Sequence, residues 1–471
     1  MPSGQEPDIS TSVAVAAREL PGKLAGLSLP RQVMVLAIWP FLEQMLSFLV
    51  TFVDTVLAGR LSVEATNAIA LTGYVGWLAA MLQSGVGIGA SAVIARAIGA
   101  RHKAVANAAL GQSMFLAIVW GSITGAVIFT CAPLLGRLTE LTGFSYSWSV
   151  LYLWTTMPAL PFSALVLVGG ACLRGAGDTR TPFWIMVIVN IVNIVASVTF
   201  VTAPGPLGGY DLGGVAAGTA VAWGTGAVLM LLVLLRGLGG IRLHTHRLRP
   251  HWHTIRRVIR VGVPALFESV GHWLGNFLVL IIVGRMARIL VVPAAMGAHI
   301  ITFRIEAVSF LLGVALGTAA ATLSGQYLGL GDPERARRAV CICWALGAAV
   351  MGAAGILFMA VPHWLVWIVT DEPELLALTP PLLIISGPIQ VFFATYLVLA
   401  FAMRGAGDTR ATMIMTFSCT YLIRVPLAYV LGLTFGLGLK GLWIGLCIEH
   451  VIRGLIFAAR FLHGGWAKAR V

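Results

Sequence analysis

Five carboxylates stand inside long apolar stretches of the sequence, at Glu43, Asp54, Glu268, Glu306 and Glu449. Charged side chains are costly in the middle of a bilayer, so those that occur there usually have a function. A carboxylate in an apolar helix can take up a proton or Na⁺, or it can attract a cationic ligand. The residue types therefore indicate ion coupling and cation binding.

Asp54 is the first candidate for ion coupling. It stands in TFVDTVLAGR, a few residues from the end of the first apolar stretch. Apolar surroundings favour the neutral form of a carboxyl group, so this residue is suited to bind and release a proton. Glu43 precedes it by about three helical turns, on nearly the same face and roughly 16 Å deeper. The alternative role for Asp54 is a buried structural hydrogen bond.

Glu268 occupies the position in the second half of the chain that corresponds to Glu43 in the first half. We therefore expect a carboxylate near mid-membrane in both halves, where the halves meet. His272 follows Glu268 by four residues on the same helical face, where the two could share a proton. The alternative is that His272 only packs. The candidate substrate-binding residues are Glu268, His272 and Glu306.

Three arginines also stand in the apolar stretches, at positions 304, 424 and 453. Glu449 and Arg453 are four residues apart, so a helix would place them side by side and let them neutralise each other. Arg304 and Glu306 are two residues apart and do not face each other, so each needs another partner.

The heptapeptide RGAGDTR occurs twice, at residues 174–180 and 404–410. Such an identity is improbable by chance, so it indicates an internal duplication. Its glycines permit turns that other residues avoid, and its aspartates are expected to act as caps or salt-bridge partners, a substrate-binding role being the alternative. Thr181 is expected to cap the next helix in the first copy, and the first arginine of each copy to reach lipid headgroups. The structural loop residues are Arg174, Gly175, Gly177, Asp178, Arg404, Gly405, Gly407 and Asp408.

The elements that must position these residues are membrane helices. The chain is 58% hydrophobic and 10% charged, whereas soluble proteins average about 25% charged. Stretches long enough to span a bilayer begin near residues 32, 66, 106, 147, 182, 213, 258, 294, 339, 376, 411 and 440. We expect an all-α polytopic membrane protein with twelve transmembrane helices in two six-helix lobes, related by pseudo-two-fold symmetry about an axis along the membrane normal.

The distribution of cations predicts the orientation. Alternate inter-span segments hold most of the lysines and arginines, and the opposite segments hold only Arg60, Arg137, Arg285, Arg288 and Lys440. Positive segments stay inside, so both termini and both RGAGDTR loops are expected in the cytosol. A bacterial inner (plasma) membrane location follows. The net charge of +13 is thereby explained without nucleic acid.

The spans divide the chain into four expected parts: a cytosolic tail at 1–31, an N-lobe at 32–237, a basic cytosolic linker at 238–257 and a C-lobe at 258–465. The linker holds four histidines, but no Cys, Asp or Glu accompanies them, so a metal site is not favoured. We expect the linker to lie at the membrane surface with Leu243, Leu248 and Trp252 dipping toward lipid. The six cysteines have no metal-type spacing.

The two RGAGDTR copies, with FVDTVLAGRL, GVPALFE, GQYLGLGD and RVPLAYVL, resemble motifs of the multidrug and toxic compound extrusion (MATE) family over about residues 32 to 463. The resemblance implies a cation-coupled exporter and assigns cation coupling to Asp54, with Asn193 of the fifth span in the same site. Glu43, on the same helix as Asp54, is a further candidate for cation coupling. In the fifth span, family members often have an asparagine followed four residues later by an acid. This chain has Asn193 followed by Ser197, and a serine cannot titrate. The coupling would then depend on Asp54 and Glu43.

The leading hypothesis is an antiporter that exports amphipathic, often cationic compounds in exchange for H⁺ or Na⁺. The alternative is a flippase for lipid-linked saccharides, which would favour cavity arginines that hold pyrophosphate. A membrane-embedded enzyme would need Asp-rich metal motifs, which the spans lack. No Walker motif occurs. We expect no enzyme activity, no cofactor besides the coupling ion, small molecules and membrane lipids as the partners, and a monomer.

Overall fold

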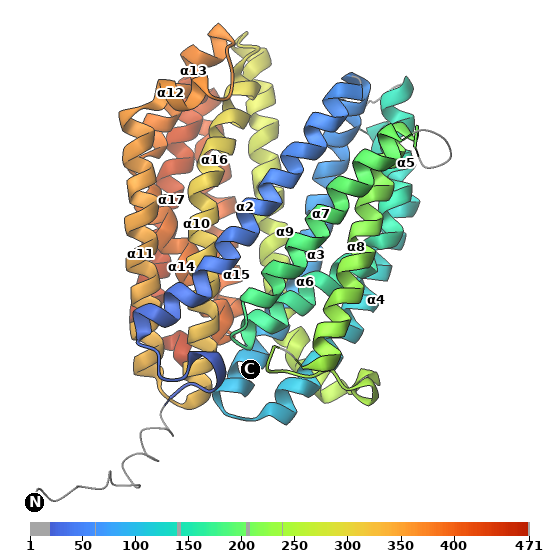
Figure 1. The fold of residues 1–471 in the computed structure, drawn as a ribbon. Helices are drawn as coiled ribbons and strands as arrows, with labels where there is room; N and C mark the ends of the chain where they lie inside the picture. The colour runs from blue at the N-terminus through green and yellow to red at the C-terminus, as the bar shows by residue number, and fades with distance from the viewer. Residues whose placement is uncertain (1–18, 62, 139–142, 204–207, 238, 470–471) are drawn as a thin grey trace, which may run out of the picture.

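A computed structural model describes residues 19–61, 63–137, 143–203, 208–237 and 239–469, together with the backbone of residue 138; for residues 48–61, 63–67 and 70 it likewise describes only the backbone. The described chain is helical and contains no β-strand. The helices divide into two groups that follow the order of the sequence and diverge toward one end of the molecule (Figure 1). The fold therefore has the expected two lobes.

Six spans form the N-lobe, and each begins within a few residues of the expected position. They are α2 (Leu29–Leu61), α3 (Val63–Gly99), α4 (Lys103–Leu138), α5 (Gly143–Thr156) continued by α6 (Leu160–Gly175), α7 (Arg180–Thr202) and α8 (Asp211–Arg236). The fourth span is interrupted by a short 3₁₀ turn at Met157–Ala159.

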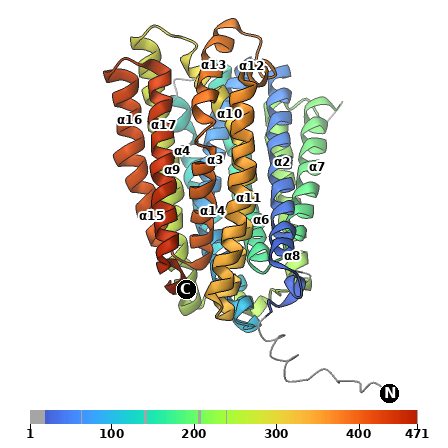
Figure 2. The same cartoon turned by 90° about the vertical axis from the view of Figure 1, so that its left-hand side faces the viewer.

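The C-lobe repeats this order with more irregularity. Its helices are α9 (Trp252–Ile289), α10 (Ala295–Leu330), α11 (Pro333–Ala360), the short α12 (Pro362–Trp367), α13 (Pro373–Ser386), α14 (Gln390–Ala406), α15 (Thr409–Ser418), α16 (Val425–Tyr429) and α17 (Gly438–His463). Helices α13 and α14 form one span that bends by 61°. Span eleven contains π-helical segments on either side of α16, at Cys419–Arg424 and Val430–Thr434. Figure 2 shows α15 and α16 stacked end to end beside α17.

Most of the twelve expected spans are found among the described residues. Ten unbroken stretches of the described chain are long and apolar enough to cross a membrane, and the bent pair α13–α14 makes eleven. Helix α2, with 33 residues, lies where the first span is expected and is not among these stretches; the side chains of its second half lie outside the described residues.

The first helix of each lobe crosses to the other lobe at the end where the lobes meet. Val33 and Leu36 of α2 are buried in the hydrophobic cluster of the C-lobe, and Val258 of α9 is buried in that of the N-lobe. Farther along, Val279 and Val283 of α9 enter a C-lobe cluster. Figure 1 shows α2 running obliquely from beneath the C-lobe to the N-lobe.

Both RGAGDTR loops fold in the same way. Gly177 and Gly407 each have a φ of +92°, a left-handed conformation that favours glycine. In both copies the next aspartate donates its backbone N–H, at 2.9 Å, to the carbonyl oxygen five residues earlier. This arrangement ends one helix and starts the next. The duplication is therefore present in the backbone conformation as well as in the amino-acid sequence.

The first and last described residues lie beside these loops. Leu20 and Leu24, which precede α2, are buried in the C-lobe cluster. At the other terminus, the carbonyl oxygen of Ala469 accepts a hydrogen bond from Arg96 at 2.8 Å. The first and last described residues are therefore on the same side of the molecule, as an even number of spans requires.

The linker between the lobes differs from expectation. Leu243 is 4% exposed and belongs to the N-lobe cluster, and Leu248 packs against that cluster. Gln112 of α4 donates hydrogen bonds to the carbonyl oxygens of Arg247 and Arg249 at 2.6 and 2.8 Å. The prediction that Leu243 and Leu248 reach lipid was wrong, because the N-lobe offers an apolar surface and a polar anchor for this segment.

Candidate ion-coupling and substrate sites

Glu43 on α2 is held by the first RGAGDTR loop. Its two carboxylate oxygens both accept from Arg174 Nη1 at 3.2 Å. The side chains of the two residues are 15% and 20% exposed, so the ion pair is largely shielded from solvent. Because Arg174 stands at the end of α6, the pair joins the crossing helix to the fourth span of the N-lobe.

Glu268 on α9 is held by the second RGAGDTR loop in an equivalent way. Arg404 Nη2, at the end of α14, lies 3.0 Å from Glu268 Oε1. The hydroxyl groups of Thr412 and Thr416 on α15 donate to the same carboxylate at 2.8 and 2.9 Å. With 4% exposure and three donors, the carboxylate is buried and its charge is compensated.

These contacts change two expectations. The prediction that Arg174 and Arg404 reach headgroups was wrong, because both bind carboxylates within the protein. The expected pairing of Glu268 with His272 does not form: His272 Nδ1 instead lies 3.5 Å from Arg453 Nη1.

The site expected around Asp54 is described only in part. Asp54 lies in α2, and its side chain lies outside the described residues. On α7, the amide nitrogen of Asn193 donates to Thr219 of α8 at 3.0 Å. The amide oxygen of Asn193 is buried and has no hydrogen-bond partner among the described residues. Ser197 donates its hydroxyl to the Val215 carbonyl at 3.4 Å. The amide oxygen of Asn193 is therefore available to accept a hydrogen bond or to bind a cation.

A buried charge cluster fills the interior of the C-lobe. The Glu449 carboxylate forms the expected ion pair with Arg453 on the same helix and a second ion pair with Arg424 from span eleven, at 3.3 Å. Arg424 also donates to Asn276 of α9 at 2.6 Å and contacts His450 at 2.9 Å. Sequence spacing predicted one of these pairs, but the partners from other helices had no local signal.

Glu306 on α10 lies in a separate polar group of the C-lobe. It is 7% exposed, and its Oε1 accepts from the Gln390 amide at 2.7 Å. Gln390 accepts in turn from the Ser309 hydroxyl at 2.8 Å. Arg304, two residues earlier, is exposed. The two residues therefore point to different environments, as their spacing predicts, and Gln390 is a member of this site that the sequence analysis missed.

Comparison with known proteins gives the family. A family model described as MatE matches residues 40–199 and 264–430, one block in each lobe. The chain belongs to the MatE family. The division of the match into two blocks agrees with the duplicated loop geometry.

Relatives of this MatE chain extend over nearly its whole length. A probable multidrug resistance protein NorM of Thermotoga maritima is 29% identical over 433 residues, which cover 91% of each chain. The multidrug resistance protein PmpM of Pseudomonas aeruginosa is 28% identical over 436 residues, covering 89% of this chain and 88% of that protein.

Solved structures have the same fold. An outward-facing multidrug resistance MATE family transporter superposes with a TM-score of 0.86 at 19% identity, covering 94% of this chain and 97% of that one. A transporter of the MOP superfamily from Pyrococcus furiosus superposes with a TM-score of 0.86 at 19% identity, covering 97% and 99%. At this identity the superpositions establish the fold alone.

The aspartates of the two RGAGDTR loops of this MatE chain form ion pairs with basic side chains near the two ends of the described chain. Asp178 forms an ion pair with Lys23 at 3.0 Å, and Asp408 forms one with Arg460 of α17 at 2.8 Å. Asp178 also accepts from the Thr181 backbone N–H at 3.3 Å, so the aspartate caps α7. The prediction that Thr181 is the cap was wrong, because α7 begins at Arg180, whereas a cap at Thr181 would start it at Pro182.

Proposed function

We propose that this chain is a secondary active exporter that moves small amphipathic, often cationic compounds across the membrane in exchange for H⁺ or Na⁺. The observation that carries the proposal is the MatE match in both lobes, together with relatives named as multidrug resistance proteins over about nine-tenths of the chain. The substrate is transported without chemical conversion, and no bound cofactor is needed besides the coupling ion.

Ion coupling is assigned to the N-lobe. Asp54 binds the coupling ion in α2, and the free amide oxygen of Asn193 on the neighbouring α7 supports this assignment. A proton on Asp54 removes the charge with which a cationic substrate would pair. Ion and substrate therefore exclude each other, which is the linkage that an antiporter requires.

Glu43 and Glu268 are assigned to the movement of the lobes. Each carboxylate links a crossing helix to the RGAGDTR loop of its own lobe. Protonation of the carboxylate, or competition by a substrate cation, would weaken its bond to the loop arginine and free the helix to tilt. Glu268 then contributes to substrate binding through an exchange of partners. Glu306 and His272 are the other proposed substrate-binding residues of the C-lobe.

The proposed organisation retains the N-lobe at 32–237 and the C-lobe at 258–465, with a monomer in the bacterial plasma membrane and both termini in the cytosol. Residues 19–31 of the tail are part of the contact between the lobes, since Lys23 pairs with Asp178 while Leu24 is buried in the C-lobe. The linker at 238–257 is docked on the N-lobe, and the helical part of its end, from Trp252, belongs to α9.

Transport in inverted membrane vesicles tests the proposal. A fluorescent cationic dye should accumulate in vesicles containing the protein when a gradient of the coupling ion is imposed. Comparison of a pH gradient with a Na⁺ gradient of the same size identifies the coupling ion. Uptake that requires ATP, or none under either gradient, would contradict it. The flippase alternative lacks support, because both buried arginines of the C-lobe already share the Glu449 carboxylate.

A further inference from the structure

Arg285, near the C-terminal end of α9, is a cationic side chain without a carboxylate partner among the described residues. Arg285 lies four residues before the end of this membrane helix, at the end opposite the RGAGDTR loops, and is exposed. Among the described residues, no carboxylate lies within 4.0 Å of it, whereas Arg404, Arg424 and Arg453 each have a carboxylate partner. An arginine in an apolar helix needs a counter-charge or a route to the headgroup region.

The face of α9 that carries Arg285 is exposed and, apart from this arginine, apolar. Val263, Phe267, Leu274 and Ile281 form an exposed apolar stripe along the helix, and Arg285 continues the stripe one turn later. At the level of Phe267 the helix is already pressed against α3 of the N-lobe on another face, where Leu266 meets Gly85. The stripe therefore lies on a face of α9 other than the one packed against α3, and its exposed apolar side chains are suited to contact lipid.

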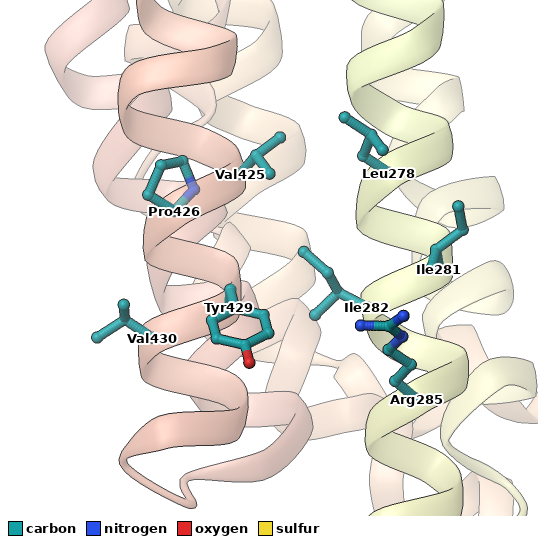
Figure 3. A pocket seen from close by; sticks show the side chains of 8 residues that line it. All are labelled: Leu278, Ile281, Ile282, Arg285, Val425, Pro426, Tyr429 and Val430. Atoms are coloured by element: carbon teal, nitrogen blue, oxygen red, sulfur yellow. The ribbon is translucent and has the colours of Figure 1, made fainter.

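A pocket of about 550 Å³ opens beside this stripe, between α9 and α16. Leu278, Ile281, Ile282 and Val425 form apolar walls, and Arg285 and Tyr429 are the polar side chains with a free head group. Figure 3 shows Arg285 on one wall and Tyr429 on the other, with Ile282 pointing into the space between the helices. The π-helical segments on both sides of α16 accompany this opening, and such segments are frequent at functional sites.

We infer that this pocket binds a phospholipid with an anionic headgroup in the leaflet opposite the RGAGDTR loops. The phosphodiester is held by the Arg285 guanidinium and the Tyr429 hydroxyl, and one acyl chain lies along Leu278 and Val425. Guanidinium groups bind phosphate oxygens through charge-assisted hydrogen bonds, and tyrosine is typical of the membrane interface. The charge of the site and its apolar depth together select an amphiphile over a free phosphate.

Lipid retention tests the inference on the full-length protein. The protein is purified in mild detergent, mixed with phosphatidylglycerol or phosphatidylcholine, and examined by native mass spectrometry and thermal unfolding. We expect phosphatidylglycerol to remain bound and to raise the melting temperature, and phosphatidylcholine and glycerol phosphate to do neither. Arg285→Ala should weaken phosphatidylglycerol binding about tenfold, the scale of one charge-assisted hydrogen bond. Tyr429→Phe should weaken it less.

Arg288→Ala is the matched control, because Arg288 is an exposed arginine of the same helix turn that does not line the pocket. Equal losses for Arg285→Ala and Arg288→Ala would mean non-specific attraction and would overturn the site. Equal retention of both lipids, or binding of glycerol phosphate alone, would also overturn it. So would a dimer that dissociates on Arg285→Ala, since the face would then be a contact between subunits.

Discussion

Arg453 and Glu449 lie one turn apart on α17 and form an ion pair in which both side chains are fully buried. Arg424 from span eleven binds the same carboxylate, so one acid neutralises two buried guanidinium groups. Removing one partner of a buried pair typically costs about 3–5 kcal/mol, because the remaining charge stays unpaired. We expect Glu449→Gln to lower the melting temperature and the yield of folded protein, measured by fluorescence-detected size exclusion. Glu334→Gln is the control, because its pair with Arg338 is exposed and should contribute about 0–1 kcal/mol.

Asp54→Asn should abolish gradient-driven efflux while the protein remains folded. The amide has the shape of the protonated acid but cannot exchange the proton, so substrate binding and ion binding lose their linkage. Dye accumulation in inverted vesicles and dye binding to the purified protein measure the two properties separately. Asp371→Asn, in an exposed turn, should transport normally. Normal gradient-driven transport by Asp54→Asn would place the coupling site elsewhere, with Glu43 the next residue to examine.

Glu268 and Arg404 should be energetically coupled. We expect a double-mutant cycle of Glu268→Gln and Arg404→Gln, read by thermal unfolding, to give an interaction of about 0.5–3 kcal/mol, as residues in contact do. Glu268→Gln should also weaken the binding of cationic dyes more than of neutral ones. A cycle that combines Glu268→Gln with Arg174→Gln serves as the control, because Arg174 binds Glu43 instead. Equal interactions in the two cycles would contradict the specific contact.

Asp178→Asn and Asp408→Asn should slow transport or reduce folding without abolishing substrate binding. Both aspartates bind terminal cations, Lys23 and Arg460, outside the proposed substrate site. Dye binding to purified protein, compared with the transport rate in vesicles, distinguishes the two effects. Complete loss of binding at normal expression would make the loops part of the ligand site.

The orientation can be tested by cysteine labelling in intact cells, in a background without the native cysteines. A membrane-impermeant thiol reagent should modify Phe435→Cys, which is 66% exposed at the end opposite the RGAGDTR loops. It should not modify His246→Cys, which is exposed in the linker. Modification of the linker position from outside would invert the topology.

The sequence predicted the helices well because each span is a long apolar stretch, and length and hydropathy are local properties. The start of every span lies within six residues of the expected position. The bend of span ten and the π-helical segments of span eleven were not predicted, since no simple residue pattern marks them.

The candidate site was predicted less well, because its contacts join distant parts of the chain. Arg174 and Glu43 are 131 residues apart, and an arginine at a helix end is equally compatible with a lipid headgroup. Four-residue spacing correctly predicted Glu449 with Arg453 but wrongly predicted Glu268 with His272. In the second case, Arg404 and two threonines from span eleven donate hydrogen bonds to the Glu268 carboxylate in place of His272.

The crossing of α2 has a consequence for how the protein is made. Gln32 near its start accepts a hydrogen bond from Tyr327, 295 residues later, at 2.8 Å. Residues 20, 24, 33 and 36 belong to a hydrophobic cluster whose other members come from helices of the C-lobe. These residues leave the ribosome among the first and must wait for α10 and α11 before they can be covered. The beginning of the chain is therefore the last part to reach its native surroundings, and a truncated N-lobe would expose it as an aggregation-prone apolar surface.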